Sequence, residues 1–341
     1  MQLTVAALLA PGKGVLAADE GLPTIEKRFK AARIPVSEEN RRAYREMLFS
    51  TPGLNEFISG VILFDETFRQ KTADGVPLAD LLVKQGIVPG IKVDRGTTNL
   101  ANFVDEKITR GLDFLRERLI EYRQLGARFT KWRAVITIGN HLPTLLCIQA
   151  NARSLALFAA LSQEAGLVPI VEPEVLMDGD HTLERCEEIT GLTLKTTFDL
   201  LMDHRVVLEQ MLLKTGMVLT GTKCPQPAGV AEVAEATLRC LRCYVPAAVP
   251  GILFLSGGQR DVDATERLNA ICGAGPAPWT LSFSFGRALQ SPALKTWKGA
   301  ADNVRPAQTA LQHRAQCNAF AVRGRYTAQI AAGMIGDYGR K

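Results

Sequence analysis

A single lysine interrupts the apolar stretch 211–219, Met-Leu-Leu-Lys-Thr-Gly-Met-Val-Leu, which has the composition of a short buried β-strand. Lysine is rarely buried unless a neighbouring group pairs with it or uses it chemically. Burial and nearby cations favour the neutral amine, which can attack a carbonyl carbon and form a Schiff base. The pattern therefore predicts that Lys214 is a nucleophile. The alternative is a structural lysine that pairs with a carboxylate or reaches solvent at a strand end.

Polar residues also lie in, or directly after, the other apolar segments of the chain. Several of them are spaced two residues apart, and side chains two apart in a strand point the same way. The set comprises Asp19, Lys92, Asp94, Lys131, Arg133, Glu172, Glu174, Ser256-Gly257-Gly258 and Ser284 with Gly286-Arg287. Charged side chains at the same level of so many strands predict one shared active site.

Two of these segments have the character of phosphate-binding loops. Gly257 and Gly258 would let backbone N–H groups approach phosphate oxygens, and Arg287 could add a charge-assisted pair of hydrogen bonds. Both loops, the second of which includes Ser284, follow the last two predicted strands, where barrel enzymes commonly bind phosphate. The alternative for Gly257-Gly258 is a plain tight turn.

The carboxylates could move the protons that Schiff-base chemistry requires. Glu172 or Glu174 could serve the carbinolamine, with one of them kept protonated by the charge of the other. Asp19 could remove a proton from a substrate hydroxyl. A structural ion pair with Lys131 or Lys214 is the alternative for the glutamates, and a turn or helix cap is the alternative for Asp19.

The elements that must position these residues alternate between strands and helices. Apolar, β-rich segments occur at 14–19, 60–64, 87–93, 129–138, 167–176, 211–219, 251–256 and 280–285, with helical patterns between them. Such alternation predicts an α/β fold, a (β/α)8 TIM barrel with its active site at the C-terminal ends of the strands. No linker interrupts the series, so we expect a single domain over 1–341 with a mobile tail from about residue 327. An open doubly wound sheet is the weaker alternative, because no G-x-G-x-x-G opens the first helix.

Composition excludes several other classes of protein. The chain has 341 residues, 47% of them hydrophobic and 22% charged, and its formal charge of +5 suits an anionic small molecule better than nucleic acid. No apolar run approaches the roughly 18 residues of a membrane span. Residues 1–11 lack the basic start and cleavage site of a signal peptide, and seven cysteines are an odd number, so we expect a cytoplasmic protein with reduced thiols. Four isolated histidines and a lone Cys240-x-x-Cys243 do not suggest a metal site, and we expect no metal or other cofactor.

Many of these motifs, in the same order, resemble class I fructose-bisphosphate aldolases over residues 11–326. They include Gly12-Lys13-Gly14-Val15-Leu16-Ala17-Ala18-Asp19-Glu20, Gly90-Ile91-Lys92-Val93-Asp94, Lys131-Trp132-Arg133, Val171-Glu172-Pro173-Glu174, Leu213-Lys214, Leu255-Ser256-Gly257-Gly258-Gln259 and Phe283-Ser284-Phe285-Gly286-Arg287. The resemblance implies a metal-independent barrel enzyme of glycolysis and gluconeogenesis, and a homotetramer. It would cleave fructose 1,6-bisphosphate reversibly into dihydroxyacetone phosphate and glyceraldehyde 3-phosphate.

The resemblance also implies a role for each site residue. Lys214 would form the Schiff base with the C2 carbonyl, Glu172 would act as acid and base, and Glu174 and Lys131 would support it. Asp19 would take the proton of the C4 hydroxyl. The 1-phosphate would bind Ser256, Gly257, Gly286 and Arg287, and the other phosphate would bind Lys92, Thr24, Arg28 and Arg133.

Two departures from the family pattern affect these implications. Gly21 replaces a serine that follows the Asp-Glu pair in vertebrate relatives, so the choice between the bisphosphate and fructose 1-phosphate stays open. The family's terminal tyrosine, which helps protonate the carbanion, has its counterpart in Tyr338, near the end of this chain but not last. The alternatives are a lysine-dependent aldolase for another sugar phosphate and a non-catalytic scaffold on the same barrel. A zinc-dependent aldolase is disfavoured by the isolated histidines.

Overall fold

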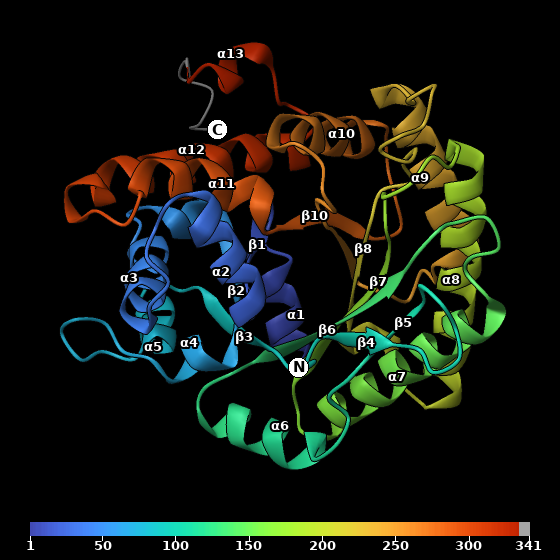
Figure 1. Ribbon diagram of the computed structural model, residues 1–341, viewed down its shortest axis with the longest axis horizontal. Helices are drawn as coiled ribbons and strands as arrows, with labels where there is room; N and C mark the ends of the chain where they lie inside the picture. Colours follow the sequence, from blue (N-terminus) through green and yellow to red (C-terminus); the bar gives the residue numbers. More distant parts are fainter. Residues whose placement is uncertain (334–341) are drawn as a thin grey trace.

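Eight parallel strands close into a barrel in the computed structural model, which describes residues 1–333 (Figure 1). The strands are β1 (Gly14–Ala18), β2 (Ile58–Leu63), β3 (Val88–Lys92), β6 (Phe129–Ile136), β7 (Val168–Val175), β8 (Leu212–Thr215), β9 (Gly251–Phe254) and β10 (Thr280–Phe285). Their order around the barrel is β1-β10-β9-β8-β7-β6-β3-β2. Each corresponds to one of the eight predicted segments, so the TIM-barrel prediction is confirmed. The division into one domain with a tail stays a prediction.

Helices surround the barrel on its outside (Figure 1). They are α1 (Gln2–Leu8), α2 (Leu22–Ala31), α3 (Glu38–Phe49), α4 (Asp65–Arg69), α5 (Leu78–Lys84), α6 (Leu115–Gln124), α7 (Leu145–Glu164), α8 (Leu183–Asp203), α9 (Val230–Tyr244), α10 (Asp261–Gly273), α11 (Arg287–Trp297), α12 (Val304–Val322) and α13 (Ala328–Ala331), with short 3-10 turns at Leu54–Glu56, Leu208–Gln210 and Ala301–Asn303. Hydroxyl side chains begin several of them: Thr144 Oγ1 accepts from Cys147 N at 3.2 Å and starts α7, and Ser37 Oγ accepts from Asn40 N at 3.1 Å and starts α3.

An antiparallel hairpin follows β3 and was not predicted. Its strands, β4 (Thr97–Asn99) and β5 (Lys107–Thr109), have three residues each and are largely polar. Such short segments carry no readable hydrophobic period, which explains why the sequence did not reveal them.

The helix α7 is long and apolar enough to cross a membrane by length and composition alone, with a mean hydropathy of 1.4, and it is the one such helix in residues 1–333. The sequence showed no uninterrupted apolar run there because polar residues such as Asn151 and Arg153 are spread along it. In the structure 56% of the window is buried, and the helix packs against β6 and β7. It therefore covers the barrel as a core helix does.

Apolar side chains fill the N-terminal end of the barrel. Phe129 lies there, in a cluster with Val15, Ile62, Val168, Ile170, Leu212 and Leu253, and α1 adds Val5 and Leu8. Glycines make room for this filling, since a Cβ on Gly90 would lie 2.3 Å from the Phe129 ring and one on Gly60 would lie 2.5 Å from Leu8. The polar side chains of the strands consequently gather at the other end.

We expect Gly90→Ala to lower the free energy of unfolding by about 1–3 kcal/mol, because the added methyl group overpacks the closed end against Phe129. The matched control is Gly273→Ala at the exposed end of α10, where the nearest atom would be 3.8 Å from the new Cβ. Thermal and urea denaturation of both variants measure the difference. Equal stability of the two variants would contradict this account of the barrel floor.

Candidate active site

A cavity of about 620 Å³ opens at the C-terminal ends of the barrel strands. Asp94 and Gly258 do not line it, but all the other predicted site residues that the structure describes do. These are Asp19, Thr24, Arg28, Lys92, Lys131, Arg133, Glu172, Glu174, Lys214, Ser256, Gly257, Ser284, Gly286 and Arg287. Tyr338 lies outside the described residues, so its role stays a prediction. The barrel thus brings residues from distant parts of the chain into one cavity.

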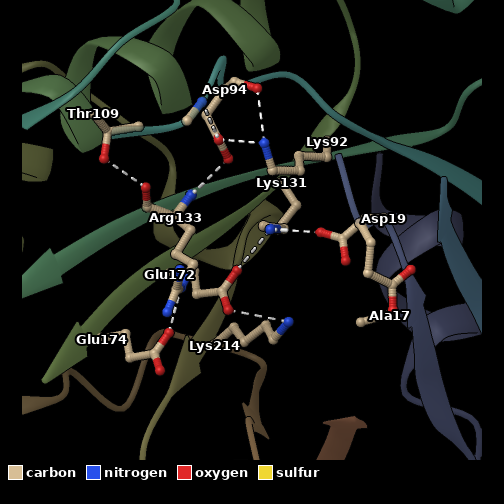
Figure 2. Close-up of polar contacts among 12 residues, drawn as sticks. Ala17, Asp19, Lys92, Asp94, Thr109, Lys131, Arg133, Glu172, Glu174 and Lys214 are labelled. Carbon is tan, nitrogen blue, oxygen red and sulfur yellow. Dashed lines mark hydrogen bonds and ion pairs between the residues drawn. The ribbon is translucent and has the colours of Figure 1, made fainter. Parts of the chain in front are cut away.

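Two lysines and two carboxylates form a continuous chain of charges across this cavity (Figure 2). Lys214 Nζ lies 3.1 Å from Glu172 Oε1, and Lys131 Nζ lies 3.1 Å from Glu172 Oε2. Lys131 Nζ also lies 2.6 Å from Asp19 Oδ2. Lys214 and Glu172 are each only 3% exposed. One carboxylate therefore joins the predicted nucleophile to a second amino group that is itself held by the predicted base.

The charge states of Asp19 and Lys131 follow from this pairing. Burial opposes the ionised form of Asp19, but the positive charges of Lys131 and Lys214 outweigh it and hold the pKa of Asp19 well below its usual range. Burial likewise disfavours the Lys131 ammonium, but Asp19 and Glu172 outweigh it and raise the pKa of Lys131. At neutral pH Asp19 is a carboxylate and Lys131 is an ammonium ion.

The second glutamate pairs differently from the first. Glu174 accepts from Arg133 Nε, and although burial disfavours the charged guanidinium, this pairing raises the pKa of Arg133. Asp94 holds the neighbouring Lys92 at 2.5 Å and accepts from the backbone N–H of Arg133 at 3.2 Å. Figure 2 shows Arg133 between Asp94 and Glu174. Glu172 and Glu174 thus each have a cationic partner, whereas the sequence suggested that the charge of one glutamate keeps the other protonated.

The loops after β9 and β10 have the geometry of an anion site. Gly257 and Gly258 adopt φ values of +47° and +95°, which favour glycine and turn the backbone toward the cavity. A Cβ on Gly258 would lie 3.5 Å from Arg287 Nη2, so the arginine passes close to this turn. The Ser284 hydroxyl is buried and has no hydrogen-bond partner among residues 1–333. A buried donor without a partner in a cationic cavity is suited to a ligand oxygen.

The helix α2 supplies the opposite side of the cavity through Thr24, Lys27 and Arg28. Arg28 forms an ion pair with Glu20, which also pairs with Arg45 at 2.5 Å. Burial of Glu20 disfavours its carboxylate, but Arg45 and Arg28 outweigh the burial and lower its pKa. Sequence reasoning gave no role to Glu20 or Lys27, although Glu20 follows Asp19 and Lys27 precedes Arg28 in the chain.

Position 21 has room for the side chain that this sequence lacks. Gly21 lines the cavity, and a Cβ there would meet nothing nearer than the Phe64 ring at 3.5 Å. The cavity therefore has room for a serine at position 21, although this chain has a glycine there.

In residues 1–333 no three His, Cys, Asp or Glu side chains gather in a way that could hold a metal ion. The cavity contains the amino group of Lys214 next to the carboxylate of Glu172. The loops with Gly257 and Arg287, in the same cavity, are suited to a phosphate. On a TIM barrel these features define the class of enzymes that attack the carbonyl of a phosphorylated substrate through a lysine.

Comparison with known proteins identifies the family within this class. Residues 1–337 match the family model described as class I fructose-bisphosphate aldolase. A probable class 1 fructose-bisphosphate aldolase of Xanthomonas campestris pv. campestris is 54% identical, covering 95% of this chain and 97% of its own. The fructose-bisphosphate aldolase of Dictyostelium discoideum is 49% identical, covering 98% and 94%. The chain belongs to the class I fructose-bisphosphate aldolase family.

A solved structure agrees with this assignment. The aldolase of Plasmodium falciparum, determined in complex with TRAP and a small-molecule inhibitor, superposes with a TM-score of 0.95 at 46% sequence identity. The match covers 96% of this chain and 95% of that one. The predicted fold and family are both confirmed.

We expect Lys131→Met to destabilise the fold by about 3–5 kcal/mol at pH 7, since it leaves the buried carboxylates of Asp19 and Glu172 without their shared cation. The pKa of Asp19 is lower in the folded than in the unfolded chain. The stabilisation by the pair is therefore complete above about pH 4, the unfolded value, and is lost as the pH falls further. Urea denaturation at pH 7 and near pH 3.5 should show the difference from wild type shrinking on acidification.

The matched control is Lys195→Met, which breaks an exposed pair with Asp199. That variant should lose at most about 1 kcal/mol. A Lys131→Met penalty that is equally small, or that grows on acidification, would contradict the proposed charge states.

Proposed function

We propose that this chain cleaves fructose 1,6-bisphosphate reversibly into dihydroxyacetone phosphate and glyceraldehyde 3-phosphate, with Lys214 as the Schiff-base amine. The observation that carries the proposal is the Glu172 carboxylate, which lies 3.1 Å from both Lys214 Nζ and Lys131 Nζ inside the cavity. Membership of the class I aldolase family supports it. The chain is thus a lyase that acts in glycolysis and gluconeogenesis.

The first half of the reaction forms the iminium ion. Lys214 first passes a proton to Glu172, which lies 3.1 Å from its Nζ. The neutral amine then attacks the C2 carbonyl carbon, and the carbonyl oxygen takes the proton that the nitrogen loses, which gives a carbinolamine. Glu172 then protonates this hydroxyl, which leaves as water while the nitrogen lone pair forms the C=N bond. Glu172 suits this role because its two oxygens face the two amino groups. Lys131 stays charged and stabilises the carboxylate that results.

Asp19 serves the second half, in which the carbon–carbon bond breaks. It takes the proton of the C4 hydroxyl while the C3–C4 electron pair moves into the iminium and leaves an enamine on Lys214. The charge of Lys131 keeps Asp19 ionised but also makes it a weak base. The proton therefore moves as the bond breaks, when the hydroxyl becomes more acidic. Protonation of the enamine at C3, which we assign to Tyr338, and hydrolysis of the imine by water then return the free amine.

The two ends of the cavity suit the two phosphates of the substrate. We assign the 1-phosphate to Ser256, Gly257, Ser284, Gly286 and Arg287, and the other phosphate to Lys92, Thr24, Arg28 and Arg133. The cavity volume of about 620 Å³ lies within the usual range for small-molecule sites. The cations along its wall match a substrate with two phosphate groups.

Fructose 1-phosphate is the second candidate substrate. Gly21 provides no hydroxyl to the second phosphate, and Arg28 already pairs with Glu20. Both features weaken the hold on that phosphate without affecting the chemistry at Lys214. A non-catalytic scaffold is disfavoured, because Lys214, Glu172 and Asp19 are all in contact with the partners that the reaction needs.

We also propose a homotetramer in the cytoplasm, on the basis of the family resemblance. The relatives include an aldolase described as chloroplastic, from Chlamydomonas reinhardtii, which is 49% identical over 95% of this chain. Location therefore varies within the family, and the cytoplasm is our proposal for this chain.

Lys214→Ala should lower kcat on the bisphosphate by about 10³-fold or more, because the covalent route is lost. Borohydride added with dihydroxyacetone phosphate should label Lys214 in the wild type and leave the variant unlabelled, as shown by peptide mapping. Lys195→Ala, at an exposed surface position, is the control and should keep full activity. Turnover of Lys214→Ala at a tenth of the wild-type rate would refute the assignment.

Gly21→Ser should raise the ratio of kcat/KM for the bisphosphate over fructose 1-phosphate by about tenfold, the value of one hydrogen bond to a charged phosphate. The rate on fructose 1-phosphate serves as the internal control and should change little. Steady-state kinetics on both substrates measure the effect. An unchanged ratio would show that position 21 does not contact the second phosphate.

A further inference from the structure

Gln290, in the first turn of α11, is 1% exposed, and both atoms of its amide group are hydrogen-bonded. Its Nε2 donates to the carbonyl oxygen of Ala17 at 2.6 Å and to Glu20 Oε1 at 2.9 Å. Its Oε1 accepts from the Tyr44 hydroxyl at 3.1 Å and, more distantly, from Arg45 at 3.4 Å. Because donors and acceptors are placed on opposite sides, the amide can take only this orientation.

The bond to Ala17 ties α11 to the end of β1. Ala17 precedes Asp19 by two residues, and a Cβ on Gly286 would lie 3.3 Å from the same carbonyl oxygen. The oxygen of Ala17 therefore lies between Gly286 and Gln290, at the point where the strand that carries Asp19 meets the start of α11 (Figure 1). A change in this contact would move the backbone that presents the carboxylate.

The bond to Glu20 extends the same connection to α2 and α3. Glu20 is buried and pairs with Arg45 of α3 at 2.5 Å and with Arg28 of α2. Gln290 thus holds the residues on both sides of the Ala17-Ala18-Asp19-Glu20 turn. In residues 1–333 the one ion pair of Asp19 is that of its carboxylate with Lys131, at 2.6 Å. Its position consequently depends on the two neighbours that Gln290 fixes.

We propose that Gln290 is a positioning residue for carbon–carbon bond cleavage. It acts through Ala17 and Glu20 to keep the Asp19 carboxylate at the C4 hydroxyl of the substrate bound to Lys214. Gln290 is not among the described residues that line the cavity, so it does not touch the substrate. The proposal rests on the function proposed above, because it presumes that Asp19 is the base.

If Gln290 had a purely structural role, its loss would affect imine formation and bond cleavage alike. Imine formation needs Lys214 and Glu172, which Gln290 does not contact, whereas bond cleavage needs Asp19 in place. A shift of about 1 Å in a reacting group can cost about 100-fold in rate. Loss of the Gln290 bonds should therefore slow cleavage and spare imine formation.

The test is Gln290→Met, which keeps the size of the side chain and removes all of its hydrogen bonds. Cleavage of fructose 1,6-bisphosphate, per active site trapped by borohydride, should fall in kcat by at least about tenfold, with KM within about threefold. The rate of borohydride trapping with dihydroxyacetone phosphate should stay within about threefold of wild type. Smaller losses of kcat, or an equal fall in trapping, would overturn the proposal.

Gln308→Met is the matched control. Gln308 is also buried, and its Nε2 donates to Met47 O at 3.1 Å and Ser50 Oγ at 3.0 Å, which ties α12 to α3 away from the cavity. This variant should lose stability and keep its kcat per trapped site. A fall in kcat as large as that of Gln290→Met would show that any buried glutamine bond has this effect, and would overturn the proposal.

If Gln290→Met does not fold, Tyr44→Phe decides the question, since it removes only the hydroxyl that orients the Gln290 amide. It should lower kcat by about threefold or more without slowing trapping, and an unchanged kcat would overturn the proposal. A wild-type protein that does not cleave the bisphosphate would instead refute the proposed function, so the two failures are distinguishable.

Discussion

The shared carboxylate of Glu172 is the interaction on which the rest of the site depends. Two amino groups lie 3.1 Å from its two oxygens, and all three side chains are buried. A single buried charge would lower the free energy of unfolding by several kcal/mol, but each charge here has an opposite charge beside it. Asp19 neutralises Lys131, which leaves Glu172 available to Lys214. The arrangement gives one lysine a fixed charge and the other a proton-accepting neighbour.

The barrel makes this balance possible by separating its interior into two ends. Phe129 and its apolar neighbours fill the N-terminal end, and α1 closes it. The charged side chains that point inward lie at the opposite end, where parallel strands bring together residues far apart in the chain. The same principle explains why Arg133 and Glu174, on adjacent strands, are partners.

Much of this could be predicted from the sequence. The β-rich segments and the i, i+2 spacing of Lys131/Arg133 and Glu172/Glu174 were sufficient to predict the barrel and the charged strand residues of its cavity, whereas Thr24 and Arg28 of α2 came only from the family resemblance. The pairing within the cavity was not predictable, because Arg133 lies opposite Glu172 in the strand register while its guanidinium reaches Glu174. The network around Gln290 was also missed, since a glutamine in a helix has no periodic signal that distinguishes a buried hydrogen-bonded amide from a solvated one.

Val5, Leu8 and Phe129 close the N-terminal end of the barrel, which affects how molecules reach the site. Substrate can enter and products can leave only at the open end, where α2 and Arg287 lie. In the proposed reaction the ketone triose stays bonded to Lys214 until water hydrolyses its imine. The aldehyde would therefore leave first and the ketone last, and the two would enter in the reverse order when the sugar is built.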